Sequence, residues 1–433
     1  MSFSDERIRV AVLGAGGLGK AACRIIGMKK ELLLCGVCDS KGFVVSSDGL
    51  DTQRLASING DLVSGYRQTA VEVKASMRSE VVNPAIAPTA EGIGPVGLLE
   101  RTGGRDVAPL EADLPVPQAR PVELSIDDCR FSIERPSSNR QSKIDNRKFQ
   151  GVGVPVPQAR AGGLHTLDRS EVGYSDDPLR DIIHRSEMWD AVLIALPNLP
   201  NGFIPGVIER FSRAHRPLVF VDVLKRTPAV RKMFALDALI KEAQAVVLTG
   251  CGATPGILAA AAVLAAQSFV EVERVDIWWG VGISNWDAYK ATIREDIAHL
   301  PGYSLERAKA MTDAEVEAIL SQRDGLLELR HMEHADDLLL QRVGVVDRLD
   351  QVEVGGLMDT RHPKKPVSTT MTLTGITFEG KRASHRFILG DETSMAANVI
   401  GPALGYLKRG IWLKAHGIFG VFGCTEFLPM VVR

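Results

Sequence analysis

The chain has 433 residues, of which 45% are hydrophobic, and its 51 Lys and Arg residues almost balance its 53 Asp and Glu residues. A chain of this length is expected to form about two or three domains with substantial cores. The formal net charge of −2 excludes the strong positive field with which proteins attract nucleic acids or anionic membranes. We therefore predict an ordinary globular protein without a nucleic-acid partner.

No stretch of the sequence has the apolar length of a membrane span. The first residues, MSFSDERIRV, hold no long apolar run, and the most apolar stretch, 256–270, is shorter than the roughly 20 residues that a spanning helix needs. Six scattered cysteines do not form the framework of a disulfide-rich secreted domain. We expect a cytoplasmic protein with no membrane partner.

Cys35 and Cys38 form a C-x-x-C pattern, which occurs in redox pairs and in zinc sites. The pattern lies inside an apolar run, residues 31–39, in which residues three apart point to opposite faces of a strand. We interpret both cysteines as buried strand residues and predict no metal site.

A glycine-rich turn follows the first apolar run of the chain. Residues 8–14, IRVAVLG, have the continuous apolar character of a strand buried on both faces of a parallel sheet. Gly14, Gly16 and Gly19 give the pattern G-x-G-x-x-G, and a helical stretch and a second apolar strand ending in Asp39 follow it. This arrangement predicts a dinucleotide-binding site; the alternative is a glycine turn with a purely structural role.

The glycines have separate roles in such a site. Gly14 permits the tight turn, Gly16 lets the pyrophosphate approach the backbone, and Gly19 lets the helix pack closely on the strand. The helix N-terminus offers N–H groups and a positive dipole to the phosphates. The predicted cofactor-binding residues are Gly14, Ala15, Gly16, Gly17, Leu18, Gly19, Asp39, Ser40, Pro197 and Gly252.

The end of the second strand bears on the choice between NAD and NADP. Asp39 is expected to accept hydrogen bonds from the adenosine ribose and to repel a 2′-phosphate, which favours NAD. Ser40 and Lys41 follow at once and could hold that phosphate instead. The sequence therefore predicts NAD and leaves NADP open.

Three further apolar runs predict the rest of a doubly wound parallel sheet. They span residues 189–197, 216–222 and 243–250 and alternate with helical stretches. Ligands bind outside the carboxyl ends of the strands in such sheets. Asp222 and Lys225 follow one of these strands, so we expect them near the reacting end of a nicotinamide.

A long irregular segment, residues 44–180, interrupts this sheet. It has weak periodicity, and the hexapeptide PVPQAR occurs in it twice, at 115–120 and 155–160. An interruption of this length is uncommon in a compact domain. We interpret it as a tolerated surface insertion with flexible parts, or alternatively as a flap or partner-binding arm at the mouth of an active site.

The pattern changes again after residue 270. A strand, helical stretches and a hairpin over 366–389 indicate an α+β arrangement, and the hairpin edge predicts pairing in a homodimer. A last helix begins near residue 394 and is expected to end at Arg409 and Gly410.

The predicted fold class is accordingly α/β, with four parts. A Rossmann doubly wound parallel sheet is formed by 1–43 and 181–270, with a partly flexible insertion over 44–180. An α+β domain for substrate binding and dimerisation spans 271–390. The C-terminal helix and tail, 391–433, return to pack on the first domain.

Three stretches resemble the saccharopine dehydrogenase-like reductases. They are VAVLGAGGLGKAA at 10–22, GCGATPGILAAAA at 250–262, and the segment 391–429, which is similar to that family's closing helix and Gly-Val-Phe tail. Residues 44–180 depart from the family pattern. The resemblance implies an enzyme that uses NAD, with NADP possible, to reduce an imine or oxidise a secondary amine of an amino-acid-like substrate.

In that chemistry the protein supplies orientation and an acid or base. Lys225 could protonate or polarise the reacting group and Asp222 could tune it; the alternative for both is a solvated loop after a strand. His299 is a candidate proton carrier, or simply a residue near a helix end.

Two other functions fit the same residues. One is hydride transfer at a C–O bond, as in homoserine dehydrogenase-like enzymes. The other is a non-catalytic nucleotide-binding scaffold or regulatory protein that captures a partner through residues 44–180. Turnover of reduced cofactor with an imine or ketone favours the enzyme, whereas stoichiometric capture without turnover favours the scaffold.

Overall fold

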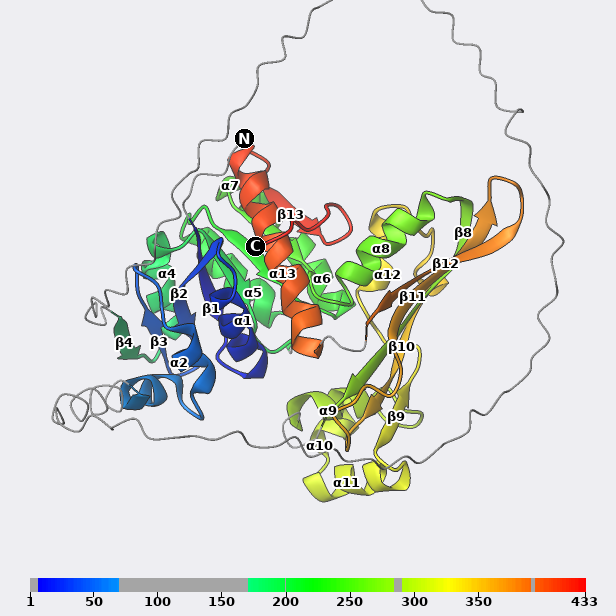
Figure 1. Ribbon diagram of the computed structural model, residues 1–433, viewed down its shortest axis with the longest axis horizontal. Helices are drawn as coiled ribbons and strands as arrows, with labels where there is room; N and C mark the ends of the chain where they lie inside the picture. Colours follow the sequence, from blue (N-terminus) through cyan, green and yellow to red (C-terminus); the bar gives the residue numbers. More distant parts are fainter. Residues whose placement is uncertain (1–6, 70–169, 199, 284–289, 391–393) are drawn as a thin grey trace, which may run out of the picture. The chain divides into compact units, whose positions relative to one another are not determined.

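The computed structural model describes residues 7–69, 170–198, 200–283, 290–390 and 394–433 (Figure 1). All of them belong to one compact unit. Most of the predicted insertion, with both copies of PVPQAR, lies outside the described residues. The described part of the chain contains two sheets with helices packed against them.

The first sheet is the predicted Rossmann sheet. Its strands are β1 (Ile8–Leu13), β2 (Leu32–Cys38), β3 (Gly42–Val45), β4 (Glu171–Tyr174), β5 (Ala191–Ile194), β6 (Val219–Asp222), β7 (Val246–Thr249) and β13 (Gly420–Gly423). They follow the order β13-β7-β6-β5-β1-β2-β3-β4, and those from β13 to β2 are parallel. Burial on both faces explains the continuous apolar runs. The chain switches direction of winding between β1 and β5, where such sheets bind ligands.

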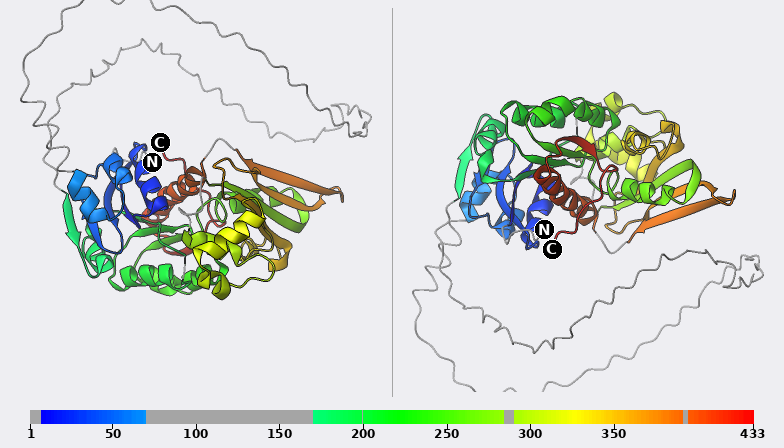
Figure 2. Two further views of the ribbon diagram at one scale, coloured as in Figure 1. Left: turned by 90° about the horizontal axis from the view of Figure 1, so that it is seen from below. Right: turned by 90° about the horizontal axis from the view of Figure 1, so that it is seen from above.

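Helices cover both faces of this sheet. α1 (Gly17–Gly27) and α13 (Met395–Ala415) pack together on one face, and α5 (Phe203–Arg213) and α7 (Asp237–Glu242) pack together on the other (Figure 2). Further helices of this region are α2 (Thr52–Ser57), α4 (Pro178–His184), η2 (Ser186–Met188) and α6 (Thr227–Phe234), and residues 62–69 are also helical. Within the described ranges, no helix has both the length and the apolar character needed to cross a membrane.

The two ends of the predicted insertion belong to the sheet. β3 pairs antiparallel with β2, and β4 pairs antiparallel with β3. The predicted boundaries at 44 and 180 therefore fall inside regular structure, β3 and α4. Strands of four residues are too short to show the alternation by which a strand is recognised in a sequence.

The second sheet and the helices around it span residues 257–389, so the predicted boundary between residues 270 and 271 falls inside β8 and leaves α8 on its other side. The elements of this region are α8 (Ile257–Ala266), β8 (Phe269–Gly282), α9 (Lys290–Ile297), α10 (Leu305–Ala310), α11 (Asp313–Gln322), β9 (Leu326–Leu329), α12 (Asp336–Arg342), η4 (Leu349–Gln351), β10 (Val352–Asp359), β11 (Thr369–Thr377) and β12 (Arg382–Leu389). The order is β12-β11-β8-β10-β9, with β8 parallel to β10 and antiparallel to β11. β11 and β12 form the predicted hairpin, and its turn contains Gly380 at φ +73°.

β12 is an edge strand of this second sheet. Its residues 382–388 are exposed, among them Phe387 and Ile388. An edge with exposed apolar side chains is a surface that another chain can cover. The homodimer expected from the sequence stays a prediction.

The last helix is longer than the sequence predicts. The expected end at Gly410 is wrong, because α13 continues to Ala415. A Cβ atom at Gly410 would lie 2.4 Å from Cγ1 of Val219 in β6, so this glycine permits close contact between helix and sheet rather than ending the helix. Lys408 donates to both carboxylate oxygens of Glu31 at 2.8 Å and ties α13 to the start of β2.

Gly410→Ala should destabilise the protein, because the added methyl group overlaps Val219. We expect a loss of about 1–3 kcal/mol in the free energy of unfolding. Gly206, inside α5, has no atom within 4 Å of a Cβ position. Gly206→Ala should therefore stabilise the protein by up to about 1 kcal/mol. Urea unfolding checks the contrast, and a Gly410→Ala protein as stable as the parent contradicts it.

Candidate functional site

Two glycines of the turn after β1 are required by the fold itself. Gly14 has φ +111°, and a Cβ atom there would lie 2.4 Å from the carbonyl oxygen of Ala195, just beyond β5. A Cβ atom at Gly19 would lie 1.8 Å from the carbonyl oxygen of Gly14. The first contact brings the turn close to the end of β5, and the second brings α1 close to β1, as a dinucleotide-binding turn requires.

The other two glycines of the turn face open space. Gly16 and Gly17 are exposed, and a Cβ atom at either would have no neighbour within 4 Å. Gly16 caps α1 without a side-chain hydrogen bond, and the first N–H groups of a helix have no acceptor within it. The turn, flanked by the half-buried Ala15 and Leu18, therefore presents an uncovered helix N-terminus to an anion.

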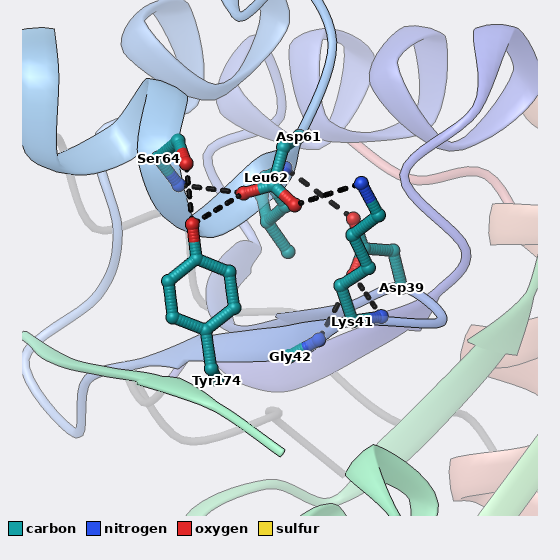
Figure 3. A network of polar contacts seen from close by, with 7 residues as sticks. All are labelled: Asp39, Lys41, Gly42, Asp61, Leu62, Ser64 and Tyr174. Atoms are coloured by element: carbon teal, nitrogen blue, oxygen red, sulfur yellow. Dashed lines mark hydrogen bonds and ion pairs between the residues drawn. The ribbon is translucent and has the colours of Figure 1, made fainter. Parts of the chain in front are cut away.

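Asp39 lies at the carboxyl end of β2 in a network of polar contacts (Figure 3). Its Oδ1 atom accepts hydrogen bonds from the backbone N–H groups of Lys41 at 2.8 Å and Gly42 at 3.0 Å, and Oδ2 accepts one from Leu62 at 3.3 Å. A carboxylate oxygen can accept two hydrogen bonds, so Oδ2 can still accept one from a ribose hydroxyl. Ser40 is exposed beside it.

A small hollow, with room for about one water molecule, lies between the glycine turn and the chain after α2. Ala15 lines it from the turn, and Gly60 and Leu62 line it from the other side. The remaining lining residues are Lys20, Cys23, Val37, Leu55 and Ile58. The hollow thus adjoins both the uncovered helix N-terminus and the Asp39 network.

Two further predicted cofactor contacts follow β5 and β7. Pro197 is exposed at the end of β5. Gly252 is buried, and a Cβ atom there would lie 3.3 Å from the carbonyl oxygen of Pro255 and 3.5 Å from Val399 of α13. The surroundings of Gly252 are therefore protein atoms, and its contact with a cofactor stays a prediction.

Asp222 is fully buried at the end of β6. Its Oδ1 atom accepts hydrogen bonds from the N–H of Leu224 at 3.0 Å, the hydroxyl of Thr249 at 3.0 Å and the N–H of Gly250 at 2.9 Å. None of the described residues donates to Oδ2. Burial raises the pKa of this carboxyl to about 6. Asp222 thus joins the loops after β6 and β7, and its part in the chemistry stays a prediction.

Lys225 lies in the loop after β6 and faces α9. Its Nζ atom is 3.9 Å from Oδ1 of Asp296, a buried carboxyl whose pKa is raised to about 6 by desolvation, although the positive charge of Lys225 opposes that shift. His299 lies near this pair, and burial, aided by the charges of Lys225 and Arg226, lowers its pKa. The structure thus brings the predicted Lys225 and His299 into one polar cluster.

A histidine and an aspartate that the sequence did not single out lie beside Lys225. The Nδ1 atom of His334 is 2.6 Å from Oδ2 of Asp336, which also accepts a hydrogen bond from the hydroxyl of Thr254 at 2.7 Å. The N–H of Ala335, between them, donates to the carbonyl oxygen of Lys225 at 2.8 Å. A carboxylate that fixes the orientation and tautomer of a histidine prepares the other ring nitrogen for proton transfer.

Within the described part of the chain, no three His, Cys, Asp or Glu side chains gather as metal ligands. Cys35 and Cys38 are both buried in β2, and burial raises the pKa of Cys35 to about 11 and that of Cys38 to about 12. Thiols with raised pKa are poor nucleophiles and poor metal ligands. Lys225 and the buried His334 are therefore the candidate proton-transfer groups at this edge of the sheet.

The doubly wound sheet, the open glycine turn and the polar groups at the carboxyl edge define a Rossmann-fold protein with a second α+β domain. No family model matches the chain. The chain is 37% identical over 425 residues to (S)-8-amino-7-oxononanoate synthase BioU of Haloferax mediterranei, and the alignment covers 98% of this chain and 99% of the relative. The chain belongs to the BioU family of enzymes.

Some solved structures are similar to this chain, but at much lower sequence identity. The C. glutamicum DAP dehydrogenase in complex with DAP is 13% identical with a TM-score of 0.45, and the alignment covers 97% of this chain and 93% of that one. A saccharopine dehydrogenase of Saccharomyces cerevisiae is 12% identical with a TM-score of 0.37 and coverages of 58% and 82%. At TM-scores this low, the resemblance to the saccharopine dehydrogenase-like reductases stays a prediction.

The buried carboxyl of Asp222 predicts a pH dependence of stability. Its folded-state pKa of about 6 lies above the value of about 4 for an unfolded aspartate, so the folded protein binds the proton more tightly. Stability should rise as the pH falls from about 6 to about 4, by up to about 1.4 kcal/mol per pH unit. Urea unfolding at several pH values should show that the free energy of unfolding of the parent rises relative to that of Asp222→Asn as the pH falls. The same pH dependence of stability in both proteins contradicts this prediction.

Proposed function

We propose that the protein is an NAD(P)-dependent oxidoreductase that transfers hydride at a C–N bond and yields (S)-8-amino-7-oxononanoate. The observation that carries the proposal is the hydrogen bond from the N–H of Ala335 to the carbonyl oxygen of Lys225, which places the pair of His334 and Asp336 next to the Lys225 loop at the carboxyl edge of a Rossmann sheet. The Haloferax mediterranei relative, whose name specifies this product, supports the choice of product.

The product has the chemistry of an amino-acid-like compound. It carries a carboxylate at one end and, next to a ketone, a secondary carbon that bears an amino group and one hydrogen. Addition of hydride to a C=N carbon and of a proton to its nitrogen forms such a centre. A bound reduced nicotinamide supplies the hydride, so the protein must supply the proton.

The glycine turn supplies the phosphate end of the cofactor site. Gly16 and Gly17 leave the N-terminus of α1 open to a pyrophosphate. Asp39 offers its Oδ2 atom to the adenosine ribose, which favours NAD over NADP. Pro197 lies at the end of β5, beside the switch point of the sheet, where the nicotinamide half continues.

Lys225 and His334 are the residues that we propose to move the proton. Because Nδ1 of His334 donates to Asp336, Nε2 is the ring atom that exchanges a proton. Lys225 protonates or polarises the reacting nitrogen. Asp222 holds the loop that carries Lys225 through its hydrogen bonds and does not contact the substrate.

Hydride transfer at a C–O bond, and a scaffold without turnover, are the alternatives. The first would form a hydroxyl product in place of an amine. The second would leave the reduced cofactor unconsumed. Analysis of the product therefore distinguishes both alternatives from the proposed function, which forms an amine.

Expression of the protein in a bacterial strain that lacks its 8-amino-7-oxononanoate synthase tests the product. The parent should restore growth without added 8-amino-7-oxononanoate, and Gly16→Val should not. A Cβ atom at Gly16 meets no protein atom within 4 Å but occupies the space that the pyrophosphate needs. The variant should therefore keep its thermal midpoint and lose NADH binding in calorimetric titration. Complementation by Gly16→Val, or unchanged NADH binding, removes the cofactor from the proposal.

Lys225→Met and His334→Asn should each lower turnover by about 100-fold or more, because each removes a proton-transfer group. Asparagine keeps a donor for Asp336, so the second change spares the hydrogen bond and removes only the outer ring nitrogen. NADH affinity should change little. Lys232→Met and His331→Asn replace exposed neighbours and serve as matched controls. Variants of Lys225 and His334 as active as these controls show that neither residue takes part.

A further inference from the structure

We propose that Asp61 is a cofactor-specificity residue, which holds the ammonium group of Lys41 in an ion pair and so withholds it from the 2′-phosphate of NADP. This inference rests on the proposed function, since it concerns the adenosine end of the same cofactor site. It adds a residue that lies outside the glycine turn and the β2 end (Figure 3).

The ion pair has one fixed and one mobile partner. Nζ of Lys41 is 3.5 Å from Oδ2 of Asp61, and the Lys41 side chain is 66% exposed while that of Asp61 is 16% exposed. Oδ1 of Asp61 accepts hydrogen bonds from the N–H of Ser64 at 2.7 Å and from the hydroxyl of Tyr174 at 3.2 Å. Asp61 is thus anchored, and the lysine side chain is the partner that can move.

The pair lies where a ribose would be bound. Asp39, the predicted partner of the ribose hydroxyls, accepts hydrogen bonds from the backbone of Lys41 and of Leu62. In the sequence, Asp61 lies between Gly60 and Leu62, and both of these residues line the hollow beside the glycine turn. A 2′-phosphate at Asp39 would be within reach of the Lys41 side chain.

The charges of Asp39, Asp61 and Lys41, which form a cluster here, determine which cofactor this part of the site binds. Asp39 and Asp61 carry two negative charges against the single positive charge of Lys41, so the cluster repels a phosphate dianion. The N–H of Ser64, followed by other donors and by Lys41, keeps the pKa of Asp61 below its usual range, so this carboxyl is ionised at neutral pH. Neutralising Asp61 alone would leave one negative and one positive charge, with the lysine released toward the phosphate.

Asp61 also has a structural role that the test must hold constant. Its side chain and its carbonyl oxygen accept the first hydrogen bonds of the helical residues 62–69, from Ser64 and Gly65. Asparagine is as good a helix N-cap as aspartate. Asp61→Asn therefore removes the charge and keeps the cap.

Calorimetric titration of the full chain with NADH and NADPH measures the effect. Asp61→Asn should tighten NADPH binding about tenfold and change NADH binding less than about threefold. Adding Lys41→Ala to Asp61→Asn should abolish the gain. Tyr174→Phe removes a hydrogen bond to Asp61 without changing the charge of the cluster, so its ratio of NADPH to NADH affinity should equal that of the parent.

Each outcome has a defined meaning. An unchanged affinity ratio in Asp61→Asn, or a gain that persists in the double variant, overturns the role of Asp61 while leaving the proposed function in place. A ratio that shifts equally in Tyr174→Phe shows a structural effect and also overturns it. A parent protein that binds neither cofactor overturns the proposed function, and this inference with it.

Discussion

One oxygen atom of a buried carboxylate holds the two loops on which the site is built. Oδ1 of Asp222 accepts hydrogen bonds from the loop after β6 and from the end of β7. The β6 loop continues to Lys225, whose carbonyl oxygen binds Ala335, and the β7 loop continues to Thr254, whose hydroxyl binds Asp336. The relative placement of the lysine and the buried histidine pair therefore depends on a side chain that solvent does not reach.

The Rossmann sheet could be predicted because strands buried on both faces leave continuous apolar runs in the sequence. The glycine turn could be predicted as well, because Gly14 and Gly19 are required by the local backbone geometry. The end of α13 was missed for the opposite reason. Gly410 is explained by Val219, a residue far away in the sequence, and a glycine that permits close packing looks the same in a sequence as one that ends a helix.

The polar groups of the site were predicted less completely. A histidine two residues before an aspartate does not by itself indicate a functional site. The contacts that residues 334–336 make with Thr254 and Lys225 exist only in the folded protein. The position of Asp222 was correct, but its burial was not foreseen. A sequence does not reveal whether a polar side chain at a strand end turns inward, because the donors that permit this come from the neighbouring strand.

The outermost strand β13 and the covering helix α13 come from the last forty or so described residues, yet they complete a sheet that begins at residue 8. Amino-terminal segments leave the ribosome first. During synthesis the apolar face above β6 and the edge of β7 consequently stay bare until the whole α+β domain has emerged. The nascent chain thus keeps this apolar surface exposed until residues 394–433 have been synthesised.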